Sequence, residues 1–572
     1  MVGLVKNMNT PKRLILRAAL LAVVSGAALV CDAWSQTVTY QCSKLLRDRL
    51  DRLELAPPAA ICGETLRSKS RLASFYEPRI YWPVWSEEGL PLAQAEALIE
   101  AVRNAEGEGL SPEEFHLDAL RSLLDDARRE ENRQSASSLA RLVDLDLLCT
   151  DALLRYGSQL LFGRTQPPEA LKEGLMDFRA ADFVAQAERA VRTNRVPQFL
   201  DQLVPSHLGY RNLRQALARY RSISDMGGWL PIKTEPVLKR TDAGEQVGEL
   251  RVRLSFECDT CYAFGSQRDT FDLDLELAVK EFQRSHGLSP SGVVDRVTYE
   301  ALNVPVETRI RQLEVNLERW RWLPRTPPDR YIEVNIAGFS LRVVERDRTV
   351  MTMKAIVGKD YQPTPILASE ITHLVLNPFW NVPRKIAWEE IIPRVKRDTS
   401  YLERRLFKVY SAAGRGRREV DPASIDWTTA DSMAYWFRQQ PGPSNALGRM
   451  KFVLPNEYGV YIHDTNAHGL FKKPVRHLSH GCIRIERPMA LAEYVLRGHS
   501  GWTRKKLASV LETDTSLTIR LPQAIPVYFL YLTAWADESG PVQFRNDVYR
   551  LDEAHYRALG STVPVIATLP KE

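Results

Sequence analysis

The spacing of apolar residues changes along this chain of 572 residues, and the change limits the folds open to it. Leu92, Ala95, Leu98 and Val102 recur at a helical period, and similar patterns extend over residues 44–220. From Tyr331 onward, apolar and polar residues alternate, which predicts β-strands. A chain of this length exceeds one hydrophobic core. We therefore expect a multidomain α+β protein with a helical scaffold first and a mostly β domain later.

The first 35 residues differ from the rest of the chain. A basic stretch precedes an apolar run over residues 18–30, and small residues follow at Ala33 and Ser35. This order predicts a secretory signal peptide over residues 1–35. The run is short for a membrane span, although an uncleaved segment would anchor the protein in the inner membrane. We therefore expect a periplasmic protein.

Charge and cysteine content restrict the partners. The formal net charge is +6, and no basic stretch is interleaved with aromatic residues, so nucleic-acid binding has no support. Export leads to an oxidising compartment where cysteines pair. Cys42 and Cys62 bracket a helical segment, and Cys258 and Cys261 form a C-x-x-C, but the sequence leaves their pairing open. A zinc knuckle would need a second C-x-x-C, which this sequence lacks.

Residues 226–305 carry a spaced pattern that resembles the small three-helix peptidoglycan-binding domain. The pattern is A-V-x-x-F-Q-x-x-x-G-L-x-x-x-G-x-x-D-x-x-T-x-x-A-L, from Ala278 to Leu302. Gly287 suits a helix C-cap, and Thr298 suits a helix start. The resemblance implies a module that docks on the wall glycan. A helical connector that only joins its neighbours is the alternative.

A thiol among imidazoles is the chemical feature of the chain. Of its ten histidines, four lie close to Cys482: His463, His468, His477 and His480. An imidazole that takes the thiol proton leaves a thiolate, which attacks carbonyl carbon. The glycine before the thiol, Gly481, permits a tight turn, and the N–H groups of Gly481 and Cys482 can face an oxyanion. If residues 482–485 form a strand, Arg484 shares the face of the thiol and can hold a carboxylate.

Two other interpretations of these residues stay open at this point. A cysteine in a turn flanked by glycine can be purely structural. The clustered side chains can also bind zinc, with His463, His477, His480 and Cys482 as ligands. Zinc would occupy the thiolate and prevent its attack on a carbonyl.

The motif resembles the signature of the L,D-transpeptidase catalytic domain of the YkuD type. The resemblance rests on Ser479-His480-Gly481-Cys482-Ile483-Arg484, with His463 upstream. Several further segments resemble the large, multidomain YcbB-like branch of that family: Tyr76 to Trp85, Asp144 to Thr150, Gly163-Arg164, Thr364-Pro365, Asn377 to Pro383, and Gly442 to Phe452. The similarity covers nearly the whole chain after the predicted signal peptide.

The resemblance implies a reaction. Cys482 attacks the carbonyl between the L-centre of diaminopimelate and the terminal D-alanine of a tetrapeptide stem, and D-alanine leaves. A diaminopimelate amine of a second stem resolves the thioester and forms a cross-link. The resemblance also implies acylation of the thiol by carbapenems, other wall-synthesis enzymes as partners, and no metal or cofactor.

The resemblance also implies roles for single residues. His463 is the base, His480 orients its neighbours, and Gly481 with Cys482 forms the oxyanion hole. Ser479 and Arg484 support the substrate pocket, and Tyr461 and Trp380 line it. His468 and His477 match no constant position and are expected in loops. Asp464 is not expected to orient His463, because adjacent side chains on a strand point apart.

Two further hypotheses about function remain. Water or an envelope protein can resolve the same thioester, which gives a carboxypeptidase or an enzyme that attaches proteins to the wall. A non-catalytic wall-binding protein is the hypothesis from another class. The expected boundaries are a signal peptide at 1–35, a helical scaffold at 36–225, the peptidoglycan-binding module at 226–305, a linker helix at 306–328, the catalytic domain at 329–535 with a helical lid insertion at about 385–440, and a tail at 536–572.

Overall fold

The computed structural model describes residues 38–53, 60–174, 183–257, 268–411, 418–429, 434–536 and 541–558. The predicted signal peptide and the pair Cys258 and Cys261 lie outside these ranges. Two compact units are present: one holds residues 1–164 and 177–205, and the other holds residues 165–176 and 206–572. Among the described helices, none has both the length and the apolar composition needed to cross a membrane.

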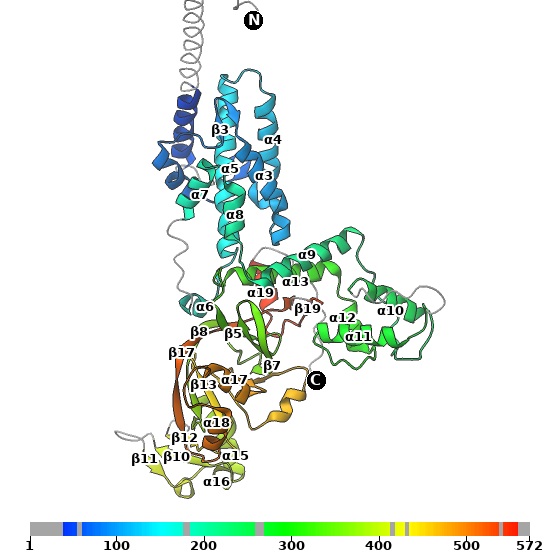
Figure 1. Cartoon of the computed structure of the whole chain (residues 1–572), viewed down its shortest axis with the longest axis vertical. Helices are drawn as coiled ribbons and strands as arrows, with labels where there is room; N and C mark the ends of the chain where they lie inside the picture. The colour runs from blue at the N-terminus through cyan, green and yellow to red at the C-terminus, as the bar shows by residue number, and fades with distance from the viewer. Residues whose placement is uncertain are drawn as a thin grey trace, which may run out of the picture. The chain divides into compact units, whose positions relative to one another are not determined.

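The first unit is helical, as the sequence predicts. Figure 1 shows α3 and α4 running beside the 27-residue helix α5. Beyond a first helix over residues 38–53, the helices are α2 (Lys69–Tyr76), α3 (Ala93–Arg103), α4 (Leu117–Arg129), α5 (Ala136–Phe162), α7 (Phe183–Arg192) and α8 (Val196–Leu203). Two short strand pairs, β1–β2 (Ala60–Ile61, Glu64–Thr65) and β3–β4 (Ser86–Glu87, Leu90–Pro91), interrupt this order. Cys42 and Cys62 are both free thiols.

Buried carboxylates of α5 fix the segments around it. Asp146 is fully buried and accepts hydrogen bonds from the Tyr76 hydroxyl at 2.7 Å and from the backbone N–H of Trp85 at 2.8 Å. Asp151 accepts from the Ser68 N–H at 2.6 Å and contacts His116 at 2.9 Å. Because a buried carboxylate needs several donors, these contacts hold α2 and the chain after it against α5.

The peptidoglycan-binding pattern folds into three helices, which confirms the expected module. They are α10 (Glu245–Ser255), α11 (Leu273–Ser285) and α12 (Arg296–Leu302). Gly287 has a positive φ of 71°, in keeping with a helix C-cap. Thr298 does not begin the last helix. Asp295 caps it instead and accepts from the Thr298 N–H at 2.9 Å.

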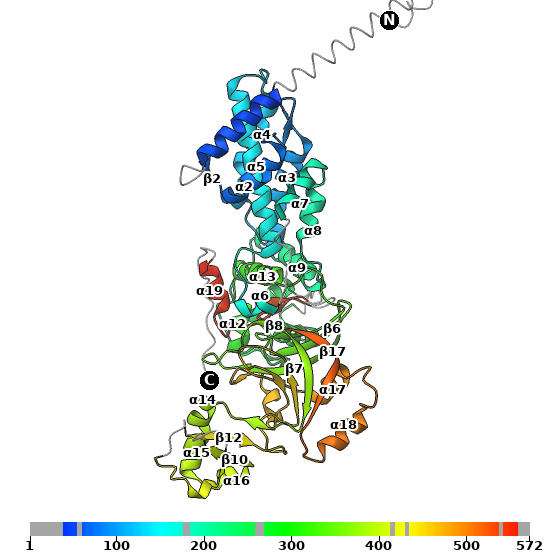
Figure 2. The ribbon, with the colours of Figure 1, turned by 90° about the vertical axis from the view of Figure 1, so that its left-hand side faces the viewer.

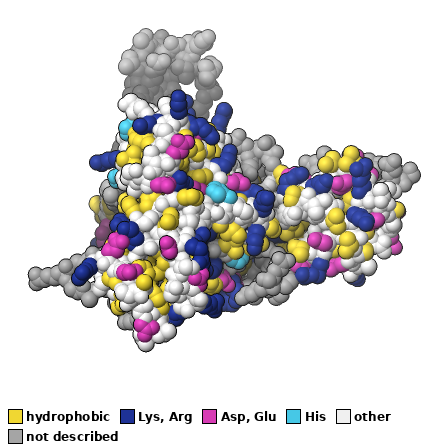
Figure 3. All heavy atoms as spheres, turned by 90° about the horizontal axis from the view of Figure 1, so that it is seen from below, with side chains coloured by type: hydrophobic (Ala, Val, Ile, Leu, Met, Phe, Trp, Pro, Cys, Tyr) yellow, Lys and Arg dark blue, Asp and Glu magenta, His cyan; other side chains and the backbone are white. Residues whose placement is uncertain are grey.

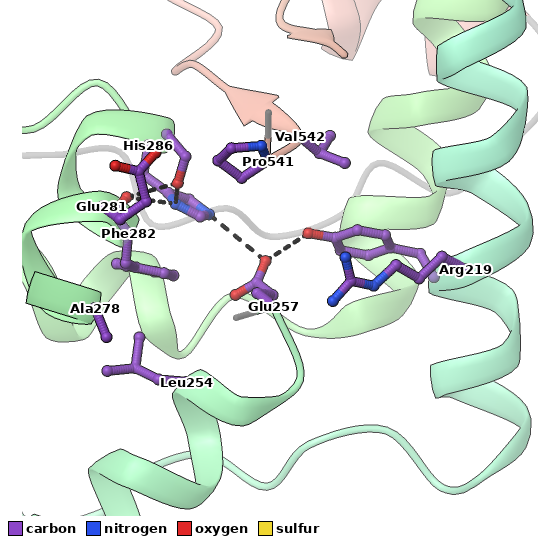
Figure 4. Close-up of a pocket in the computed structure, with 11 residues that line it drawn as sticks. Arg219, Leu254, Glu257, Ala278, Glu281, Phe282, His286, Pro541 and Val542 are labelled. Atoms are coloured by element: carbon purple, nitrogen blue, oxygen red, sulfur yellow. Dashed lines mark hydrogen bonds and ion pairs between the residues drawn. The ribbon is translucent and has the colours of Figure 1, made fainter. Parts of the chain in front are cut away.

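The module is joined to helix α9 (Leu208–Asp225) by a buried polar cluster. Figure 4 shows Glu257, just after α10, pointing toward His286 at the end of α11. The Tyr220 hydroxyl of α9 donates to Glu257 at 2.5 Å, and the Arg253 guanidinium donates to it at 2.8 Å. Together with Pro541 and Val542, these elements line a small pocket.

Burial governs the charge of this cluster. Burial lowers the pKa of His286 to about 3, with Arg309 acting in the same direction and Glu257 against it. Burial alone would raise the pKa of Glu257, but Arg253 and His286 outweigh it and lower that pKa to about 2. The cluster therefore holds a carboxylate and a neutral imidazole at neutral pH.

The main sheet of the second unit is closed. Its strand order is β15-β7-β16-β14-β13-β8-β17-β5-β6, and β6 also pairs with β7, which closes the ring. The strands are β5 (Arg330–Asn335), β6 (Ser340–Glu345), β7 (Arg348–Gly358), β8 (Leu367–Leu376), β13 (Met450–Val453), β14 (Ile462–His463), β15 (His477–Ser479), β16 (Ile483–Ile485) and β17 (Leu517–Leu530). Helix α13 (Val306–Arg321) precedes the sheet, and Ala170 of α6 (Glu169–Gly174) joins its core.

Two helices follow the motif along the chain. These are α17 (Pro488–Val495) and α18 (Arg504–Leu511), which lie beside β17 in Figure 2. The break contains Gly498 and Gly501, with φ of 85° and 90°. A positive φ cannot continue a right-handed helix, so the chain turns there. Leu491 and Leu507 then pack into the core of the sheet.

The insertion over the sheet contains helices, as expected, and also a sheet that its charge-dense sequence concealed. The helical parts are α14 (Arg384–Ile386), η5 (Ala387–Ile391), α15 (Ile392–Arg397) and α16 (Tyr401–Arg404). The strands are β9 (Trp380–Asn381), β10 (Phe407–Ser411), β11 (Arg418–Val420) and β12 (Tyr435–Gln439), in the order β11-β10-β12-β9. Val395, Phe407 and Phe437 belong to a core separate from that of the closed sheet.

The tail returns to the closed sheet. It contains β19 (Gln543–Phe544), which pairs with β18 (Ala534–Trp535), and α19 (Leu551–Ala558). Buried Asp552 of α19 pairs with Arg319 of α13 at 2.5 Å and accepts from the Thr533 hydroxyl at 2.6 Å. On the face shown in Figure 3, Lys and Arg side chains are interspersed with Asp and Glu.

We expect acid to loosen the three-helix module through His286. The unfolded chain binds a proton near pH 6.5, whereas the folded module binds it only near pH 3. Stability is therefore full above pH 6.5 and falls as the pH drops, by up to about 1.4 kcal/mol per pH unit. The lowered pKa of Glu257 adds to this loss only below about pH 4.5. Hydrogen exchange of α11 peptides at pH 7 and pH 5, corrected for intrinsic rates, measures the effect.

His286→Phe keeps an aromatic ring against Phe282, whose ring centroid lies 3.9 Å away. We expect this variant to lose the dependence on pH between 6.5 and 4.5. The matched control is His499→Phe, at a site outside the module, which should behave as wild type. An unchanged dependence on pH in His286→Phe would contradict the assignment.

Candidate functional site

Two neighbouring parallel strands carry the motif. Ile462 of β14 lies opposite Ile483 of β16, and His463 lies opposite Arg484. Side chains two residues apart on a strand share a face. Tyr461 and His463 therefore lie on the same face as Cys482 and Arg484. The expectation that Arg484 shares the face of the thiol follows from this register.

Ser479 closes the turn before the thiol. Its hydroxyl donates to the Cys482 carbonyl at 2.6 Å and accepts from the Gly481 N–H at 3.1 Å. Gly481 has a φ of 111°, which favours glycine. Because the Gly481 N–H already bonds to Ser479, it does not point at an oxyanion in this conformation. Ser479 shapes the turn that presents the thiol.

Two residues outside the motif, Thr364 and Tyr549, support this turn through hydrogen bonds. The Thr364 hydroxyl donates to the Gly481 carbonyl at 2.7 Å and accepts from the Gly358 N–H at 2.9 Å. Tyr549 of the tail donates to the Gly358 carbonyl and accepts from the Thr364 N–H at 3.3 Å. Thr364 belongs to a segment that resembles the family, but nothing in the tail sequence pointed to Tyr549.

The groups around the thiol have opposing effects on its pKa. Burial raises the pKa of Cys482, while the backbone and hydroxyl of Tyr461, the ammonium of Lys451 and the guanidinium of Arg484 act to lower it. The Lys451 Nζ lies 3.8 Å from the centroid of the Tyr461 ring. Hydrogen bonds and positive charge therefore favour the thiolate, although burial retains the proton at rest.

His463 is a neutral imidazole. It is buried, and burial, with the charge of Arg484, lowers its pKa to about 3. Its ring lies 5.5 Å from the Tyr461 ring, edge to face. A neutral imidazole on the face of the thiol can accept a proton during reaction. At rest it adds no positive charge to the site.

His480 faces the insertion. Its Nε2 lies 2.7 Å from the Glu390 carboxylate of η5. Burial lowers the pKa of His480, and Glu390 opposes that effect. His480 therefore connects the turn at Cys482 to the insertion, a contact that the sequence could not reveal.

Trp380 reaches the site from the insertion. Its side chain hydrogen-bonds to the Tyr461 hydroxyl, which also interacts with the thiol. The Trp380 ring lies 6.2 Å from the Phe407 ring in the core of the insertion. The structure thus brings Trp380, Tyr461 and Cys482 close together, and their role as the lining of a substrate pocket stays a prediction.

The other two histidines of the cluster lie apart from the thiol. His468 begins a short 3₁₀ helix (His468–Lys472) and lies 3.4 Å from Asp464. Asp464 accepts from the Arg449 N–H at 2.8 Å, in keeping with the view that it does not orient His463. His477 lies in strand β15 and not in a loop. In the described part of the chain, no group of three His, Cys, Asp or Glu side chains is placed to hold a metal ion.

Three family models match this chain. Residues 70–217 match the "Scaffold domain", residues 244–302 the "Putative peptidoglycan binding domain" and residues 329–506 the "L,D-transpeptidase catalytic domain". The last match includes the site described above. Residues 329–506 form an L,D-transpeptidase catalytic domain. The peptidoglycan-binding domain precedes it, as the pattern from Ala278 to Leu302 indicated.

A relative from Haemophilus influenzae, named "Putative L,D-transpeptidase", is 34% identical over 248 residues. That match covers 43% of this chain and 49% of the relative, so it spans about half of the relative's length. A solved L,D-transpeptidase from Xylanimonas cellulosilytica is 15% identical and covers 53% of this chain and all of its own, with a TM-score of 0.17. One from Mycobacterium smegmatis is 11% identical and covers 35% of this chain and 58% of its own, also with a TM-score of 0.17.

We expect Thr364→Val to destabilise the L,D-transpeptidase domain by roughly 1–3 kcal/mol, because it leaves the Gly481 carbonyl and the Gly358 N–H unpaired. Urea denaturation measures the loss. The matched control is Thr372→Val, since that hydroxyl donates to the Val453 carbonyl at 3.4 Å and not to the turn at Cys482. Equal stability of the two variants would show that the Thr364 hydroxyl does not hold the turn.

Proposed function

We propose that this protein is an exported peptidoglycan L,D-transpeptidase with Cys482 as its nucleophile. The carrying observation is the pairing of β14 with β16, which puts the thiol on one face with Tyr461, His463 and Arg484. The family of residues 329–506 supports the reaction class. The signal predicted over residues 1–35 supports export to the periplasm.

The proposed reaction has two transfers. Cys482 gives its proton to His463 as its sulfur attacks the carbonyl between diaminopimelate and terminal D-alanine. The tetrahedral intermediate collapses, D-alanine leaves with the proton from His463, and a thioester remains. An amine of a second stem then attacks the thioester, His463 takes the amine proton, and the thiol is restored as the cross-link forms.

The charges around the site suit this substrate. Arg484 is largely buried, and burial lowers its pKa while the neighbouring thiol and Glu390 oppose that effect. A guanidinium there can hold a stem carboxylate in two parallel hydrogen bonds. Trp380 and Tyr461 give the pocket an aromatic wall, and the N–H of Cys482 can face the oxyanion.

The remaining parts of the chain complete the proposal. We propose the boundaries 226–305 for wall binding and 329–535 for catalysis, with the insertion at about 385–440 as a lid over the site. The contacts Glu390–His480 and Trp380–Tyr461 support a lid, because both join the insertion to the motif. A closed lid excludes water from the thioester, which favours an amine acceptor.

We expect Cys482→Ala to abolish cross-linking of purified tetrapeptide stems, because the proposed thioester forms on the sulfur of Cys482. Mass spectrometry of the products is the measurement. The matched control is Cys62→Ala, which removes a free, exposed thiol and should leave the products unchanged. Cross-links formed by Cys482→Ala would refute the catalytic proposal and leave a wall-binding protein. If wild type converts the tetrapeptide stems to tripeptides and forms no cross-links, the protein is a carboxypeptidase.

A carbapenem should acylate the thiol, because its strained carbonyl meets the same nucleophile. We expect the intact mass of wild type and of Cys62→Ala to rise by the mass of one inhibitor molecule. Cys482→Ala should show no adduct. An unchanged mass of wild type after prolonged incubation would count against Cys482 as an accessible nucleophile.

A further inference from the structure

Lys451 lies on the face of the thiol. It belongs to β13 and sits opposite His463 of β14, so the two side chains share a face. Its Nζ is 3.8 Å from the centroid of the Tyr461 ring, and the Tyr461 hydroxyl interacts with the Cys482 sulfur. The ammonium, the ring and the thiol therefore form a continuous row across three strands.

Lys451 differs from two other buried cations of the second unit. Arg342 pairs with Glu333 at 2.8 Å, and Arg319 pairs with Asp552 at 2.5 Å. Lys451 is half-buried, yet no carboxylate of the described residues lies within ion-pair distance of it. Burial lowers its pKa, and the thiol of Cys482 is the charge that opposes this effect. A half-buried ammonium without a carboxylate is costly unless another anion is available.

The other groups near the thiol do not replace this charge. His463 is neutral at rest, because burial lowers its pKa to about 3. Arg484 faces both the thiol and Glu390, so part of its charge is balanced by that carboxylate. His480 is also paired with Glu390. For Lys451, the group that opposes the effect of burial on the pKa is the Cys482 thiol and not a carboxylate.

We propose that Lys451 is a positioning residue that holds the Tyr461 ring and stabilises the Cys482 thiolate by its charge. The cation–π contact fixes the ring, and the ring carries the hydroxyl that hydrogen-bonds to sulfur. The ammonium then favours the thiolate by its positive charge, which acts strongly where burial removes water. The inference rests on Cys482 being the nucleophile of the proposed function. The Lys451 ammonium supplies the positive charge that a neutral His463 lacks.

The test is the pH profile of Cys482 alkylation by iodoacetamide, in which sulfur displaces iodide and no stem peptide is needed. Peptide mapping separates Cys482 from the other thiols. We expect Lys451→Met to raise the midpoint of the profile by about one pH unit and to slow alkylation about tenfold at pH 7. Lys451→Arg should keep a midpoint close to that of wild type, since it retains the charge.

Lys354→Met is the matched control. Lys354 is a lysine of β7 in the same sheet, and its Nζ donates to the Phe471 carbonyl at 3.1 Å. This variant should alkylate as wild type does. Lys451→Gln serves as a second neutral variant if Lys451→Met does not fold, with circular dichroism as the check. Tyr461→Phe keeps the ring and removes the hydroxyl, so it separates the hydrogen bond from the charge.

A midpoint that stays at the wild-type value in a folded Lys451→Met or Lys451→Gln would overturn the inference. So would a Lys451→Arg profile that matches the neutral variants, because the role would then be packing alone. Failure of the proposed function looks different: wild type would alkylate normally and form neither a cross-link nor a released D-alanine.

Discussion

The parallel pairing of β14 with β16 is the constraint on which the catalytic face depends. Two parallel strands cannot be joined by a tight turn, so a long connection must leave β14 and return beside it. That connection is itself held, because β15 pairs with β7 and Ser479 closes the turn at Cys482. The register of this one pair decides that Tyr461 and His463, and not their neighbours, meet the thiol.

Burial then determines the charge states on that face. Removing water favours the neutral forms of both Cys482 and His463, so a resting pair of thiolate and imidazolium is not stabilised. The positive charges that remain come from Lys451 and Arg484, on the strands to either side. The site therefore combines a dry environment, which suits acyl transfer, with fixed cations that make ionisation of the thiol attainable.

The sequence predicted those features that depend on residues close to one another in the chain. The helical period gave the scaffold, the spaced pattern gave the three-helix module, and alternation gave most of the closed sheet. It could not predict contacts between distant segments. Nothing near Tyr549 or Glu390 indicates that each lies close to the turn at Cys482. The strands of the insertion were hidden because charged residues on exposed positions, such as Lys408 between Phe407 and Val409, masked a short alternation.

The insertion has a hydrophobic core of its own, built on residues such as Val395 and Phe437. Its apolar side chains therefore pack around a centre separate from that of the closed sheet. Because the two cores are separate, evolutionary changes in the insertion and in the closed sheet can occur independently. Under the proposed function, the thiol and its neighbouring charges belong to the sheet, so changes in the insertion alter the choice of amine and leave the reacting groups in place.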